Sequence, residues 1–107
     1  MSARALINVP KAAKRGEVIE IKTLISHPME TGYRPKGDGS FFPRDIIHKF
    51  VCTLNGEEIF RADLYPAIAA NPFITFTTVA REGGLLVFSW IDDRGEAQME
   101  SAKLVVE

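Results

Sequence analysis

Four side chains in this 107-residue sequence belong to the types that bind copper in small β-proteins: His27, Met29, His48 and Cys52. A blue-copper centre needs two histidines and one cysteine around the metal, with a weak axial methionine. The cysteine, one histidine and the methionine usually follow one another in a single late loop. No histidine follows Cys52 here. The spacing therefore argues against a copper or electron carrier, and we expect no bound metal.

Cys52 and His48 are also the residue types of a nucleophile and its general base. Four positions apart on a strand, however, their Cα atoms would lie roughly 13 Å from each other. We expect Cys52 to be a buried, unreactive thiol. As the only cysteine in the chain, it forms no internal disulfide.

The remaining candidates for chemistry lie at turns. Asp92-Asp93 and Glu57-Glu58 are paired acids whose side chains diverge, so we interpret them as solvated turn residues. Gly83-Gly84 precedes no helical pattern, which excludes a phosphate loop, and no dinucleotide or serine-elbow motif is present. We expect no catalytic set and no cofactor, and hence not an enzyme.

Composition and charge narrow the possible partners. A net charge of −1, from 13 Lys and Arg against 14 Asp and Glu, leaves no electrostatic footprint for nucleic acid or an anionic membrane. Residues 1–107 have the length of one domain. No apolar run is long enough to span a bilayer, and the first residues lack the apolar stretch of a secretory signal.

Short strand-like segments separated by turn residues run through the whole chain. Positions 17–26 alternate between apolar and polar residues, the pattern of a half-buried strand. Seven such segments and no long helical pattern predict an all-β, immunoglobulin-like antiparallel sandwich. The predicted strands are 5–9, 17–26, 46–54, 57–65, 73–80, 85–91 and 96–106.

The strands at 46–54 and 57–65 flank Asn55-Gly56, the strongest short signal of a two-residue hairpin turn. That turn places Cys52 opposite Ile59, Phe50 opposite Arg61 and His48 opposite Asp63. A structural role at the strand ends is the expected one for the His48–Asp63 pair.

In this register the hairpin is apolar on both faces. Phe50, Cys52 and Ile59 lie on one face, and Val51 and Phe60 lie on the other. Either another part of the chain, such as residues 41–43 of the long 26–45 loop, or a second protein must cover the extra apolar face.

Several segments resemble one known family: ISHPMETG (25–32), PRDIIHKF (43–50), the turn at 55–56 and FRADLYPAIAANP (60–72). WIDDRG (90–95) fits the last hairpin of the same family. The chain resembles the Z subunits of SoxYZ, the sulfur-carrier complex of the thiosulfate-oxidising Sox system. The likeness spans nearly the whole chain.

The resemblance implies an immunoglobulin-like subunit that pairs with a SoxY-like carrier subunit. In this family the Y subunit bears a glycine-rich C-terminal arm whose cysteine holds the sulfur intermediates. The Z subunit has no such arm, so Cys52 is not expected to be the carrier cysteine. The implied role is a non-catalytic scaffold that holds the Y subunit and offers a surface to other Sox enzymes.

The family works in the periplasm, and its Z subunit lacks an export signal of its own, which implies co-export with the partner. A free-standing ligand- or protein-binding module remains an alternative, and self-association of the isolated chain stays open. We expect the partner interface on the hairpin and the long loop, at His27, Met29, Tyr33, Phe50, Ile59 and Arg61.

Overall fold

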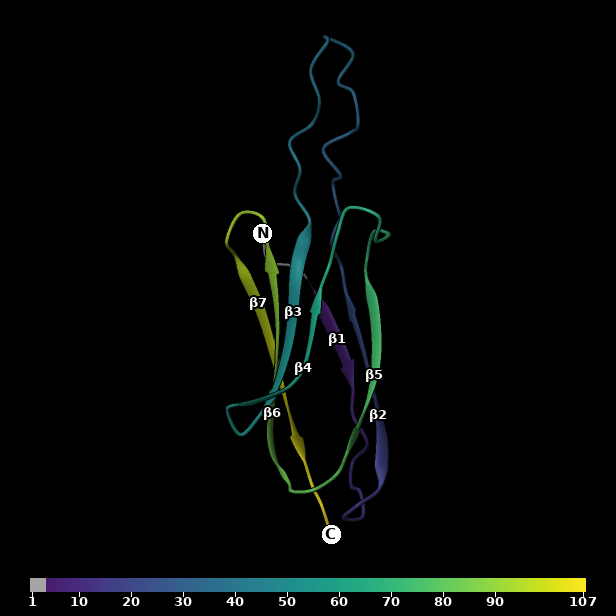
Figure 1. The fold of residues 1–107 in the computed structure, drawn as a ribbon, viewed down its shortest axis with the longest axis vertical. Coiled ribbons are helices and arrows are strands. Elements are labelled where there is room, and N and C mark those ends of the chain that lie inside the picture. Colours follow the sequence, from purple (N-terminus) through teal and green to yellow (C-terminus); the bar gives the residue numbers. More distant parts are fainter. Residues whose placement is uncertain (1–3) are drawn as a thin grey trace.

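The computed structural model describes residues 4–107, which fold into two packed antiparallel sheets (Figure 1). One sheet has the strand order β1-β2-β5, and the other has the order β4-β3-β6-β7. The all-β sandwich of seven strands is confirmed, and the described residues contain no helix. The strands are β1 (Ala5–Asn8), β2 (Val18–Ile25), β3 (Ile47–Leu54), β4 (Glu57–Asp63), β5 (Phe73–Val79), β6 (Gly84–Asp92) and β7 (Ala97–Leu104).

The alternation in β2 sets its inner face as predicted. Ile19, Ile21 and Ile25 are buried, while Glu20 and Lys22 point to solvent. This is the ordinary arrangement of an antiparallel strand with one covered face.

Aromatic rings fill the centre of the core. The ring of Phe50, which is fully buried, lies 5.2 Å from Trp90, 6.0 Å from Phe60, 6.2 Å from Phe76 and 6.4 Å from Phe88, measured between ring centres. Such tilted and offset pairs add to the free energy gained by burying the rings. Phe50 therefore links both sheets at the middle of the sandwich.

The β3–β4 turn forms as predicted, but beyond it the pairing of the two strands differs from the predicted register. Asn55 and Gly56 have φ values of 51° and 84°, as a two-residue turn of this kind requires. Thr53 then faces Glu58, whereas the next position, Cys52, faces Phe60. Ile59 is the extra residue of a β-bulge, which shifts every later pair by one position.

The bulge overturns the prediction of an apolar second face on this hairpin. Phe60 and Ala62 lie opposite Cys52 and Phe50 and pack against the core, while Arg61 lies opposite Val51 on the outside. The predicted His48–Asp63 pair is also wrong, because Asp63 lies opposite Lys49.

The long segment between β2 and β3 projects beyond the end of the sandwich (Figure 1). Its two arms are joined by bridges between Glu30 and Asp45 and between Pro35 and Phe41. The Phe42 ring lies under the Arg34 guanidinium within this projection, at 3.6 Å from the ring centre, and Phe41 is exposed. Residues 41–43 therefore do not cover the hairpin, contrary to the first of the two alternatives.

The substitution Phe50→Ala should lower the free energy of unfolding by about 3–5 kcal/mol, because it leaves a cavity between the sheets. Urea unfolding followed by the fluorescence of Trp90 measures this. Phe73→Ala is the matched control, since Phe73 is 63% exposed, and should cost about 1 kcal/mol or less. Equal losses for the two variants would contradict the placement of Phe50.

Candidate functional site

The outward surface of the four-stranded sheet carries small and apolar side chains from three adjacent strands. Val51 of β3 lies beside Ser89 of β6, which lies beside Met99 of β7. The neighbouring rows join Ile91 to Ala97 and Thr53 to Val87. We call this surface the outer face and define it by Val51, Leu85, Val87, Ser89, Ile91, Ala97 and Met99.

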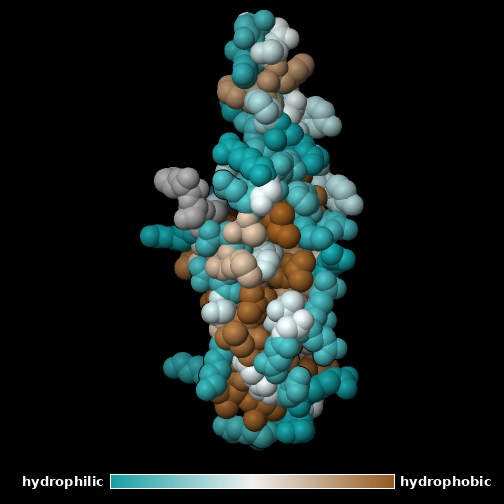
Figure 2. Space-filling view, turned by 90° about the vertical axis from the view of Figure 1, so that its left-hand side faces the viewer, coloured by the Kyte–Doolittle hydropathy of each residue, from teal (hydrophilic) through white to brown (hydrophobic). Residues whose placement is uncertain are grey.

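The outer face is partly open to solvent. Met99 is 57% exposed and Leu85 is 51% exposed, while Val51, Val87 and Ile91 are half-buried. Figure 2 shows apolar side chains gathered in a band along one side of the molecule, flanked by hydrophilic ones. Lys49, Arg61, Asp63 and Lys103 continue the same rows of side chains and border the outer face. An apolar centre with a charged border is typical of a protein interface.

The other outward surface, on the three-stranded sheet, is less continuous. Leu6, Leu24 and Phe73 form one row across its three strands, and Val18 and Val79 pair at the other end, but Glu20, Lys22 and threonines of β5 occupy the rows between them. Exposed residues of this surface therefore serve as controls for substitutions in the outer face.

The six residues predicted for the partner interface are scattered in the structure. Phe50 and Met29 are buried at 0% and 3% exposure, so their assignment to a surface is corrected. His27 is also buried, and Ile59 is half-buried against the core. Tyr33, which lies on the projection, and Arg61, at the border of the outer face, are exposed and remain predictions for contact with a partner.

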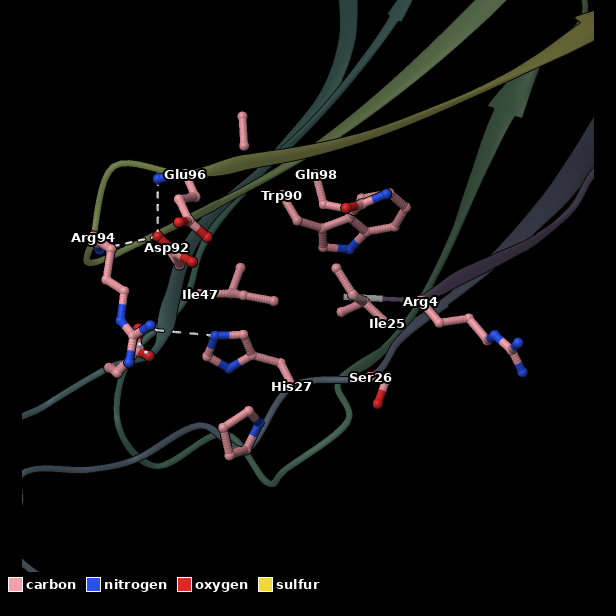
Figure 3. A pocket seen from close by; sticks show the side chains of 13 residues that line it. Arg4, Ile25, Ser26, His27, Ile47, Trp90, Asp92, Arg94, Glu96 and Gln98 are labelled. Atoms are coloured by element: carbon pink, nitrogen blue, oxygen red, sulfur yellow. Dashed lines mark hydrogen bonds and ion pairs between the residues drawn. The ribbon is translucent and has the colours of Figure 1, made fainter. Parts of the chain in front are cut away.

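A cavity of about 940 Å³ opens at one end of the sandwich, between the edges formed by β1 and β7 (Figure 3). Trp90, Ile25 and Ile47 form its apolar part. Polar groups from several segments complete this end cavity: Arg4, Ser26, His27, Asp45, Asp92, Arg94, Glu96 and Gln98.

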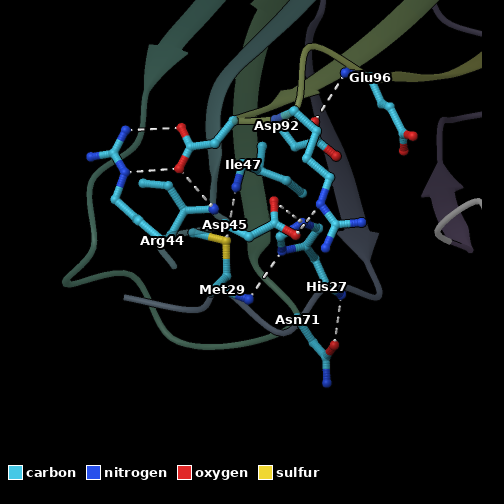
Figure 4. A network of polar contacts seen from close by, with 11 residues as sticks. His27, Met29, Arg44, Asp45, Ile47, Asn71, Asp92 and Glu96 are labelled. Atoms are coloured by element: carbon cyan, nitrogen blue, oxygen red, sulfur yellow. Dashed lines mark hydrogen bonds and ion pairs between the residues drawn. The ribbon is translucent and has the colours of Figure 1, made fainter. Parts of the chain in front are cut away.

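His27 is held in one orientation by backbone hydrogen bonds (Figure 4). Its Nδ1 accepts the Met29 N–H at 3.0 Å, and its own backbone N–H donates to Asn71 Oδ1 at 2.9 Å. Met29 is fixed in turn, because its sulfur accepts the Ile47 N–H at 3.3 Å. The lone pair of Nδ1 is therefore occupied, and the neutral ring carries its proton on Nε2.

Within residues 4–107, one group of three potential metal ligands lies close together: His27, Asp45 and Asp92, with ligand atoms within 4.8 Å of one another. It is a different set from the copper ligands considered from the sequence. Asp92 Oδ1 already accepts the N–H groups of Arg94 and Glu96 at 2.9 and 3.0 Å. Because His27 also presents an N–H from Nε2 rather than a lone pair, this set fits a metal poorly.

Two buried polar atoms at the end cavity have no hydrogen-bond partner in the described part of the chain: Trp90 Nε1 and Asp45 Oδ1. An unpaired buried donor or acceptor costs about 1–3 kcal/mol of stability. Asp45 Oδ1 lies 3.9 Å from His27 Nε2, and its other oxygen lies 3.1 Å from Arg94 Nε. A small approach would pair Asp45 with His27.

A bidentate ion pair joins the base of the projection to the β6–β7 turn. Arg44 Nε and Nη2 each donate to Asp93 at 2.8 Å, and Asp93 Oδ2 also accepts the Ile46 N–H at 3.1 Å. The hydrogen bonds from Arg44 hold the pKa of Asp93 below its usual value. This pair fixes the segment that supplies Asp45 to the end cavity.

Cys52 is buried between the sheets, as predicted. Burial raises the pKa of its thiol to about 12, so the reactive thiolate is scarce at neutral pH. This position suits a packing role and not a covalent carrier.

A family model described as "Sulphur oxidation protein SoxZ" matches residues 7–103. The chain belongs to the SoxZ family. It is thereby a subunit of the Sox sulfur-oxidation system, as the resemblance in its sequence predicted. No curated protein sequence matches the chain.

Solved structures with this fold include the SoxY sulfur carrier protein of Chlorobium limicola f thiosulfatophilum. It has 13% identity and a TM-score of 0.66, with 96% of this chain and 78% of that chain covered. A superoxide reductase (neelaredoxin) from Ignicoccus hospitalis has 17% identity and a TM-score of 0.73, with 96% of this chain and 80% of that chain covered. At these identities the likeness concerns the fold alone.

Substituting Asp93 by Asn should reduce stability by about 1–2 kcal/mol at pH 7, because it removes a charge-assisted bond to a half-exposed arginine. The lowered pKa of Asp93 means that this stability is present above the ordinary aspartate pKa. It is lost as the pH falls through the lowered value, so wild type and variant should converge in acid.

Urea titrations give the free energy of unfolding of wild type and variant from pH 7 down to the lowest pH at which both stay folded, and so measure this convergence. Glu58→Gln is the control, since Glu58 is half-exposed and lies 3.7 Å from Arg61, where an ion pair contributes little. A constant gap between wild type and Asp93→Asn at every pH would contradict the assignment.

Proposed function

We propose that this chain is the non-catalytic scaffold subunit of a heterodimeric sulfur carrier, and that it holds a SoxY-like subunit through the outer face. Membership of the SoxZ family supports the assignment to a carrier complex. The observation that carries the proposal is the partly exposed apolar surface shared by β3, β6 and β7.

The outer face has the properties that a stable partner requires. Its centre is apolar, its border is charged, and its strands pack on the aromatic core. Arg61 lies in the row of Val51, Ser89 and Met99, where its guanidinium can bind an acidic group of the partner.

The partner we propose carries the sulfur intermediates on its own cysteine, because Cys52 is enclosed in the core. Periplasmic location and co-export with this partner also belong to the proposal. They require a complex that forms before export and persists, which favours an extended apolar contact over a few charged ones. Residues 4–107 contain no helix suited to crossing a membrane.

Capture from the native host with the tagged full-length chain tests the proposal. We expect one stoichiometric partner whose intact mass includes an adduct that a reductant removes. Recovery of the chain alone, as a monomer, would contradict the carrier proposal and favour a free-standing binding module.

Met99→Glu should reduce the amount of captured partner about tenfold or more, because it places a charge in an apolar contact. Leu6→Glu is the matched control: Leu6 is 60% exposed on the three-stranded sheet and should leave capture unchanged. Circular dichroism establishes that both variants are folded. Loss of capture with Leu6→Glu alone would move the interface to the other sheet.

A further inference from the structure

The three-stranded sheet ends at β5, whose outer edge has no neighbouring strand within residues 4–107 (Figure 1). Pro72 O accepts the Ile25 N–H at 3.2 Å, and the Ala80 N–H donates to Glu17 O at 2.8 Å, so the backbone groups of even-numbered residues face β2. Because these groups alternate along an antiparallel strand, those of the odd-numbered residues point to the free edge. These residues are Phe73, Thr75, Thr77 and Val79. No other described segment donates to their carbonyls or accepts from their N–H groups.

The edge of β5 lacks the features that protect the other edge strands against pairing with another chain. Charges, bulges and short length are the usual protection. β4 has the bulge at Ile59 and charged residues at both ends, β7 carries Glu100 and Lys103, and β1 has only four residues. By contrast, β5 (FITFTTV) has seven residues without a charge, a glycine or a proline, and its register with β2 is unbroken. Among the described edges, β5 is therefore the one best suited to accept a further strand.

A second copy of β5 fits this edge. When two β5 strands run antiparallel about a two-fold axis at Phe76, Phe73 of one copy lies opposite Val79 of the other, and Thr75 lies opposite Thr77. Odd-numbered positions then face odd-numbered positions, so every outward N–H and C=O of β5 meets a partner. Aromatic side chains opposite β-branched ones, and threonines opposite threonines, are favourable cross-strand pairs. The strand is thus complementary to itself.

The same pairing joins two exposed apolar groups on the outward surface of the three-stranded sheet. Leu6, Leu24 and Phe73 form a row at one end of this surface, and Val18 pairs with Val79 at the other. Phe73 is 63% exposed and Val18 is 64% exposed. In the two-fold arrangement, the valine pair of one copy continues the apolar row of the other copy, and by symmetry this happens twice. Apolar area that is open to water in the single chain becomes covered.

We propose that this chain forms a two-fold symmetric homodimer in which the β5 edges of two copies pair and unite their three-stranded sheets. Each copy has one β5 edge, so the assembly closes at two chains. The copies point in opposite directions, which keeps their projections at opposite ends of the dimer. The outer face lies on the other sheet. The homodimer therefore does not depend on the proposed function, and each copy in it can still bind a carrier partner.

Sedimentation velocity of the full-length chain over a concentration series tests the homodimer. We expect a single monomer–dimer equilibrium. Thr77→Pro should weaken dimerisation about tenfold or more, because it removes one outward N–H from each copy and leaves the hydrogen bonds to β2 intact. Thr77→Val is the matched control, since it retains the N–H and should dimerise as the wild type does. Circular dichroism establishes that both variants are folded.

Two double variants test the register. With Thr75→Glu and Thr77→Lys in one chain, each glutamate should lie opposite a lysine of the second copy, and the dimer should persist. With Thr75→Glu and Thr77→Glu, like charges should lie opposite each other twice, and dimerisation should be about tenfold weaker than in the first double variant. Within each chain, Thr75 and Thr77 pair with Lys22 and Glu20 of β2, so the first variant also suits its own sheet.

A chain that stays monomeric at every concentration would overturn the proposal. So would equal dimerisation of the two double variants, or of Thr77→Pro and the wild type, because the β5 backbone would then not form the contact. Open-ended oligomers would also contradict it, since a two-fold pairing closes. If β5 becomes protected from hydrogen exchange only when a carrier partner binds, a strand of that partner occupies the edge and the homodimer is wrong.

Discussion

The β-bulge at Ile59 is the constraint on which the surface of this protein depends. An unbroken register from the Asn55-Gly56 turn would place Phe60 on the outside of the sheet. With one extra residue, Phe60 instead stacks on Phe76 of the opposite sheet, with ring centres 4.3 Å apart and planes 7° from parallel. Burial of a large aromatic ring outweighs the disruption of one strand pair.

Because of the bulge, β4 presents polar residues to solvent, and the exposed apolar surface moves toward β6 and β7. Arg61 and Asp63 lie at the border of the outer face and not at its centre. The protein thus has one broad apolar surface with a charged border on that side of the sandwich. This arrangement connects the fold to the proposed pairing, because an interface needs such a centre and such a border.

The strands could be predicted from the sequence because each depends on local pattern. The alternation at 17–26 and the Asn55-Gly56 turn are examples, and the structure places both as expected. The register beyond Thr53 could not be predicted, since it follows from contacts between Phe60 and a residue distant in sequence, Phe76. The predicted interface failed at Phe50 for a different reason: the pattern of β3 does not show which of its two faces packs on the other sheet, and the Phe50 face is the buried one.

The end cavity was also missed, because its residues come from four separate segments. Asp45, Trp90 and Arg94 carry no motif, and only the packing of β3 against β6 brings them together. His27 was recognised as a candidate, but its role depends on a hydrogen bond from Met29 that spacing does not reveal. The sequence pattern therefore predicted the strands and turns, whereas the end cavity can be recognised only in the folded structure.

Hydrogen–deuterium exchange of the full-length chain, alone and in complex with its carrier partner, tests the central claim most directly. We predict slower exchange in β7 (97–104) on complex formation, with smaller effects in β6 and β3, and unchanged exchange in β5 (73–79). Protection confined to β1, β2 and β5 would place the partner on the opposite sheet and contradict the account.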